Sequence, residues 1–265
     1  MPIDIPARLV LAPVLALQAL RLRAAAQVLP EARGQRSGTA GMGPRLRVLI
    51  VGDSSAAGVG AATQAEALAG RIVADLSRDH RVEWRLIARS GATALSMLEM
   101  LRADAGGRFD VAVVTLGVND AKNGVPWALY LARMRRIVAL LSGRYGAGRI
   151  YVSGLPPVGL FPVLPQPLRW ILGSQVARFD RLLAYAARRI PGMVHVPPDF
   201  TLDVTDLAID GFHAGPRLYR RWGRCLARAV RAGDAVRHAP SYDLRGAAGT
   251  APRAWGAALS RRFRR

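Results

Sequence analysis

From Leu46 to about Val230, short apolar runs alternate with segments whose apolar residues recur at helical spacing. Runs that end in glycine, asparagine or proline, with helical segments between them, are typical of buried parallel strands. About 180 residues of this alternation predict an α/β domain with helices on both faces of a parallel sheet. The predicted strands lie within RVLIVGDSS, VEWRLIARSG, FDVAVVTLGVND, RIYVSGLPP and MVHVPP.

Capping signals locate the helices between these strands. Thr63 and Glu66 fit a capping box that opens a helix reaching about Ser77, and Thr93 fits the N-cap of the next helix. Pro126 suits the first turn of a long helix. That helix is expected to reach about Leu141, and further helices are expected within 166–190 and from about Pro216 to Val230.

The chain carries a formal net charge of +20, and 37 of its 38 basic residues are arginine because Lys122 is its one lysine. This bias fits the codon usage of a GC-rich genome, but it also fits a polyanionic partner. Net charge is +5 in residues 1–47 and +7 in residues 228–265, so charge density is highest at the two ends. Apolar residues occur beside the positive charge at both ends, and this combination favours an anionic membrane surface over nucleic acid as the partner.

The apolar segment 9–20 has four interpretations. It is shorter than the roughly 18 residues of a membrane span. A cleaved signal peptide is disfavoured because Arg21 and Arg23 follow the segment directly. An interfacial anchor and a helix docked on the domain both stay open. The expected location is therefore bacterial-type, either cytoplasmic or peripherally membrane-associated.

Composition divides the chain into three parts. Residues 1–45 combine the apolar segment with a flexible linker, because 31–44 are rich in glycine and serine. Residues 46–232 form the α/β domain, and 233–265 a basic C-terminal tail. In the tail, Trp255, Leu259 and Phe263 would share one face of a basic amphipathic helix, unless the tail is disordered.

Polar or small residues follow the first three predicted strands, namely Ser54, Gly91 and Asn119. In parallel sheets, binding and catalysis concentrate at the carboxyl ends of the strands. Among the four histidines, His213 stands out because Asp210 precedes it by three residues, a spacing that places both side chains on one side of a turn. An aspartate so placed orients the imidazole as a general base.

Four short blocks occur in the order Gly52-Asp53-Ser54-Ser55, Gly91, Gly117-Val118-Asn119-Asp120 and Asp210-Gly211-Phe212-His213. Over residues 46–230 the chain thereby resembles the SGNH (GDSL-type) hydrolase family. The resemblance implies a three-layer α/β/α sandwich whose parallel, flavodoxin-like sheet has about five strands. It also implies an oxyanion hole and a catalytic triad. The implied triad is Ser54 as nucleophile, His213 as base and Asp210 as its orienting acid; the oxyanion donors are the N–H groups of Ser54 and Gly91 and the side-chain amide of Asn119.

Two positions depart from the family pattern. Ser55 stands where leucine is common, which leaves a second hydroxyl beside the nucleophile, and Ala214 stands where proline is common. Cys225 is the one cysteine, and no cluster has metal-ligand spacing, so we expect neither a metal nor a cofactor.

The apolar stretch after the fourth strand predicts the substrate class. Phe161, Leu164 and Trp170 could line an acyl pocket, or this stretch could be a packed connection. The expected function is a serine ester hydrolase, carboxylesterase- or lipase-like, that cleaves apolar small-molecule or lipid esters through a covalent acyl-serine. The alternatives are a carbohydrate O-deacetylase using the same site and a non-catalytic membrane-associated binding protein.

Overall fold

The computed structural model describes residues 4–25 and 27–238, with side chains described for 10–25 and 27–233. The amphipathic tail helix expected around Trp255 therefore lies outside the described residues. The helices are α1 (Asp4–Ala25), α2 (Ser54–Ala57), α3 (Leu68–Leu76), α4 (Ala94–Ala103), α5 (Val118–Lys122), α6 (Trp127–Gly143), α7 (Leu168–Ala187) and α8 (Pro216–His238), with 3₁₀ turns η1 (Val158–Leu160) and η2 (Val204–Asp206). The strands are β1 (Ser37–Ala40), β2 (Arg45–Gly52), β3 (Arg81–Ala88), β4 (Val111–Thr115), β5 (Arg149–Ser153) and β6 (Met193–Val196).

Within the described residues, the six strands form one sheet in the order β1-β3-β2-β4-β5-β6. Strands β2 to β6 pair in parallel, and β1 adds an antiparallel edge to β3. The five parallel strands are those predicted from the sequence, and their order is that of a flavodoxin-like sheet. The α/β class is therefore confirmed.

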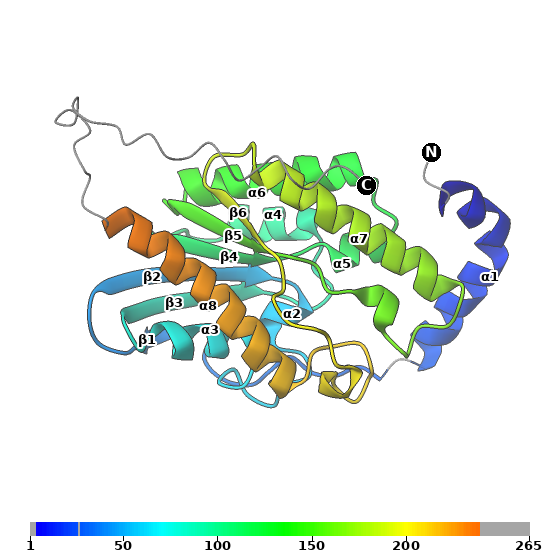
Figure 1. The fold of residues 1–265 in the computed structure, drawn as a ribbon, viewed down its shortest axis with the longest axis horizontal. Helices are drawn as coiled ribbons and strands as arrows, with labels where there is room; N and C mark the ends of the chain where they lie inside the picture. The colour runs from blue at the N-terminus through cyan, green and yellow to red at the C-terminus, as the bar shows by residue number, and fades with distance from the viewer. Residues whose placement is uncertain (1–3, 26, 239–265) are drawn as a thin grey trace, which may run out of the picture.

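Alternate residues of the central strands face two separate cores. In β2, Leu49 and Val51 face the core covered by α4, α6 and α7, whereas Val48 and Ile50 face the core under α3 and α8. All four are fully buried, which is why these runs are almost continuously apolar. Figure 1 shows the two helical layers on opposite sides of the sheet, the three-layer arrangement expected.

Two local expectations were wrong. The linker predicted over 31–44 contains β1, which pairs with residues 82–85 of β3; its glycine and short side chains suit a brief, exposed edge strand. The helix expected from Thr63 begins instead at Leu68, and Thr63–Glu66 form a turn before it. The cause is Gln64, whose buried amide donates to the Ala32 and Ala57 carbonyls and draws this turn into the domain.

Helix α1 contains the apolar segment 9–20 and lies at the end of the sheet toward which the parallel strand arrows point (Figure 1). Within the described part of the chain, no helix has the length and apolarity needed to cross a membrane.

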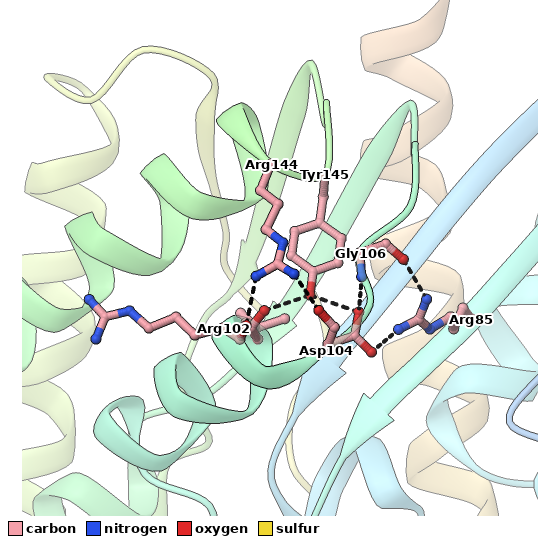
Figure 2. Close-up of polar contacts among 7 residues, drawn as sticks. Arg85, Arg102, Asp104, Gly106, Arg144 and Tyr145 are labelled. Atoms are coloured by element: carbon pink, nitrogen blue, oxygen red, sulfur yellow. Dashed lines mark hydrogen bonds and ion pairs between the residues drawn. The ribbon is translucent and has the colours of Figure 1, made fainter.

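At the opposite end of the sheet, Asp104 ties three elements together (Figure 2). Its carboxylate accepts hydrogen bonds from Arg85 of β3, from the Gly106 N–H at 2.8 Å and from the Tyr145 hydroxyl at 2.9 Å. Arg144 donates to the Asp104 backbone carbonyl at 2.5 Å. Partial burial by itself would raise the pKa of Asp104, but the hydrogen bonds from Gly106, Tyr145 and Arg85 outweigh it and lower that pKa.

Asp104→Ala should lower the free energy of unfolding by about 2–3 kcal/mol, because it leaves a buried phenol and a guanidinium without their charged acceptor. Asp199→Ala is the matched control: its ion pair with Arg228 is exposed on both sides and should contribute at most about 1 kcal/mol. Urea unfolding of both variants measures this. If both variants lost the same unfolding free energy, the Asp104 network would contribute no more to stability than the exposed Asp199–Arg228 pair.

Candidate active site

Ser54 begins α2 directly after the central strand β2. Gly52 makes this turn feasible, because a Cβ there would lie 2.2 Å from the Thr115 hydroxyl oxygen and 2.7 Å from Ala56. Asp53 caps α2 by accepting the Ser55 N–H at 2.9 Å. Ser54 itself is only half-buried, so its hydroxyl stays open to a reactant.

Asp210, His213 and Ser54 form one chain of hydrogen bonds. His213 Nε2 lies 3.1 Å from Ser54 Oγ, and His213 Nδ1 lies 2.5 Å from Asp210 Oδ2. A carboxylate at Nδ1 favours the tautomer that is protonated there, which leaves Nε2 to accept the serine proton. The three residues predicted as a set are thus brought together across 159 positions of sequence.

Backbone donors fix the Asp210 carboxylate. Its Oδ1 atom accepts the N–H groups of Phe212 and His213, both at 3.0 Å. Partial burial opposes ionisation, but the His213 ring and these two N–H groups outweigh it and lower the pKa of Asp210. Asp210 is therefore an anion that can orient and stabilise a protonated imidazole.

Gly91 and Asn119 follow the strands on either side of β2. Gly91 has φ +76°, a conformation that favours glycine, and a Cβ there would meet no atom within 4 Å, so this backbone faces open space. Asn119 is buried, and its amide nitrogen donates one hydrogen to the Ala92 carbonyl at 3.1 Å. That bond holds the amide beside Gly91 and leaves its second hydrogen for another acceptor.

The predicted substrate residues separate into buried and exposed ones. Phe161 and Leu164 belong to the core, whereas Trp170 is 43% exposed. We call residues 161–170 the wall turn. Phe161 packs edge-on against Phe212, with ring centroids 5.3 Å apart, and Phe212 packs edge-on against the His213 imidazole at 5.4 Å. Phe212 was given no role from the sequence, although its place between Gly211 and His213 was a signal for one.

A second aspartate–histidine pair lies elsewhere in the domain. His195 Nε2 lies 2.8 Å from Asp180 Oδ1, an atom that also accepts the Leu155 N–H. These contacts indicate a packed, structural role for His195. Within the described residues, no group of three or more histidine, cysteine, aspartate or glutamate side chains could hold a metal ion.

The family model described as GDSL-like lipase/acylhydrolase matches residues 50–221. The chain belongs to this family. The SGNH resemblance found in the four sequence blocks is thereby confirmed, and with it the assignment to a family of ester hydrolases. A search of the curated proteins finds no significant match.

Three of the solved structures that share the fold are bacterial esterases. An acetylxylan esterase from Geobacillus stearothermophilus is 17% identical, with a TM-score of 0.53 over 71% of this chain and 95% of its own. A carbohydrate acetylesterase from Sinorhizobium meliloti is 16% identical, with a TM-score of 0.53 over 71% and 99%. An inhibitor-bound aryl esterase of M. smegmatis is 20% identical, with a TM-score of 0.52 over 71% and 99%. At these identities the likeness establishes the fold alone.

Burial makes Asp53 an unusual helix cap. It raises the pKa of Asp53 from 3.8 to about 6, although the Ser55 N–H opposes this. Between pH 3.8 and about pH 6, Asp53 binds a proton more readily in the folded chain than in the unfolded chain. The free energy of unfolding therefore falls as pH rises through this range.

Asp53→Asn keeps an oxygen that can accept the Ser55 N–H but removes this cost. Between about pH 4 and about pH 7, the variant should gain about 2–3 kcal/mol of unfolding free energy relative to the wild type. Asp203→Asn is the control: the Thr205 hydrogen bonds lower the pKa of Asp203 from 3.8, so its pH-dependent contribution lies mostly below this window and the variant should show no comparable gain between these pH values. Urea unfolding at both pH values decides; no pH-dependent gain in Asp53→Asn would contradict the burial argument.

Proposed function

We propose that this protein is a serine carboxylic ester hydrolase in which Ser54 is the nucleophile, His213 the general base and Asp210 the residue that orients and stabilises it. The observation that carries the proposal is the unbroken hydrogen-bond chain Ser54–His213–Asp210 at the carboxyl end of the central strand. A serine hydroxyl becomes an effective nucleophile only when an adjacent base takes its proton.

The reaction follows from this geometry in two halves. His213 Nε2 takes the Ser54 proton as Oγ bonds to the ester carbonyl carbon, and the imidazolium then protonates the departing alkoxide. Water attacks the resulting acyl-serine with the same base assistance, releasing the acid and restoring Ser54. The negative charge on the carbonyl oxygen would be stabilised by the N–H groups of Ser54 and Gly91 and by the amide of Asn119.

Apolar acyl esters are the proposed substrates. The aromatic contacts from Phe161 through Phe212 to His213 support this, because they place apolar surface beside the base. A carbohydrate O-deacetylase is the second candidate, since two of the similar structures are named as an acetylxylan esterase and a carbohydrate acetylesterase. A p-nitrophenyl ester series from acetate to palmitate separates them: a deacetylase would lose its activity beyond the shortest acyl chains.

Ser54→Ala should lower kcat by at least about 10³-fold with the fold intact, because no acyl-enzyme can form. Ser55→Ala, the matched loss of the neighbouring hydroxyl, should keep most of the activity. Both variants are assayed for ester hydrolysis and for covalent labelling by a fluorophosphonate, and circular dichroism checks that they fold. Labelling that survives in Ser54→Ala and disappears in Ser55→Ala would assign the nucleophile to Ser55.

Asn119→Ala should reduce kcat by about 10²–10³-fold and leave KM nearly unchanged, because the lost hydrogen bond forms mainly in the transition state. Asn123→Ala is the control on the same short helix segment, since Asn123 is exposed and caps the end of α5. Steady-state kinetics distinguish the outcomes. An effect confined to KM would make Asn119 a residue that binds the ground-state ester.

A further inference from the structure

One side of α1 packs on the domain. Leu11, Leu15, Gln18 and Leu22 recur at helical spacing and are half-buried, and Leu22 packs against the core covered by α7. This stripe is the usual pattern of a helix docked on a folded body. The docked-helix interpretation of the apolar segment therefore accounts for one face of α1.

The other side of α1 is apolar as well. Val10 is 80%, Val14 45%, Leu17 49% and Leu20 66% exposed; we call these four residues the outer face. Gln18 is the one polar side chain between positions 10 and 20, and it lies on the docked side. A helix that meets water normally carries polar residues there, so docking alone does not explain the outer face.

Gln18 ties α1 to the wall turn. Its amide nitrogen donates to the Gln166 carbonyl at 2.6 Å, and its amide oxygen accepts the Leu168 N–H at 3.2 Å. The wall turn is braced internally by Arg169, which donates to the carbonyls of Leu164 at 2.6 Å and Pro162 at 3.0 Å. The outer face is thus held in a defined position relative to the wall turn.

The wall turn also contacts the loop that carries Asp210 and His213. The nearest atom to a Cβ placed on Gly211 would be Val163 Cβ, at 3.3 Å. Large apolar side chains are exposed on η1, on the wall turn and on this loop, and we call them the apolar rim: Leu160 (56%), Val163 (38%), Trp170 (43%) and Ile209 (83%). Figure 1 shows α1, η1 and the first turns of α7 at the same end of the sheet.

We propose that the outer face of α1 and the apolar rim together bind an anionic lipid surface, so that the candidate active site faces the bilayer and takes acyl esters of membrane amphiphiles. Arg21 and Arg23 are exposed on the last turns of α1, and the whole chain carries +20, which complements anionic headgroups. An apolar helix face joined to basic residues binds at the interface without spanning it. The substrate part of this inference rests on the proposed ester hydrolysis.

The test uses two full-length variants that change net charge equally. Val10→Glu/Leu20→Glu places two carboxylates on the outer face. Met42→Glu/Tyr185→Glu places two on exposed apolar residues at the other end of the sheet, where Met42 is 87% and Tyr185 54% exposed. Each protein is sedimented with phosphatidylcholine vesicles with and without phosphatidylglycerol, at low and high salt.

Wild type and the Met42/Tyr185 variant should sediment with the anionic vesicles, and added salt should release them. The Val10/Leu20 variant should partition at least about tenfold more weakly. Equal sedimentation of the two variants, or none by the wild type, would overturn the proposal. A stable dimer that the Val10/Leu20 changes dissociate, without vesicle binding, would assign the outer face to a second copy of the chain.

Hydrolysis provides the second readout. Both variants should cleave a soluble p-nitrophenyl ester like the wild type, which also shows that they fold. Only the Val10/Leu20 variant should lose activity on an acyl ester embedded in anionic vesicles. Binding without hydrolysis of the embedded ester would overturn the substrate assignment. Failure of wild type to cleave any soluble ester would instead contradict the proposed function and leave the sedimentation result to decide membrane binding.

Discussion

The candidate site depends on the parallel alignment of β2 between β3 and β4. Gly52, the last residue of β2, pairs with Ala88 on one side and Thr115 on the other. The segments that follow these three strands therefore leave the sheet at one edge and bring Gly91, Ser54 and Asn119 to it. The absence of a side chain at Gly52 lets α2 pass close over Thr115, which sets the height of Ser54 above the sheet.

The base His213 lies in the loop just before α8, and α8 helps to hold that loop at this edge of the sheet. The loop before that helix is closed on itself by backbone hydrogen bonds, from Ala208 N–H to the His213 carbonyl and from Gly215 N–H to the Asp206 carbonyl, both at 2.8 Å. Tyr219, on the first turn of α8, donates its buried hydroxyl to the Val59 carbonyl at 2.6 Å. This bond connects α8, which follows the base, to the segment just after α2, which carries the nucleophile.

The arginines of the domain have more than one role. Arg47 pairs with Asp110 at the start of β4, and Arg231 pairs with Asp75, which joins α8 to α3. These partly buried pairs place guanidinium groups between secondary-structure elements. Part of the positive charge is therefore tied to the architecture, whereas Arg21 and Arg23 are exposed beside the outer face of α1.

Much of the architecture was predictable because it depends on local patterns. Apolar runs that end in Gly-Asp or Gly-Val-Asn specify buried parallel strands, and Thr93 as an N-cap specifies the start of α4. The spacing of Asp210 and His213 already placed carboxylate and imidazole together. The late start of α3 was not predictable, because it follows from the long-range hydrogen bonds of Gln64.

The sequence by itself determined the α/β class, the five parallel strands and the residue types needed for acyl transfer, since each depends on neighbours within a few positions. Tertiary structure decided which of these residues meet: that His213 rather than His195 reaches a serine, and that Asp53 is buried enough to bind a proton near pH 6. It also decided that 37–40 add a strand and that α1 lies beside the wall turn. These outcomes depend on pairing and burial between segments far apart in the chain, which no local pattern records.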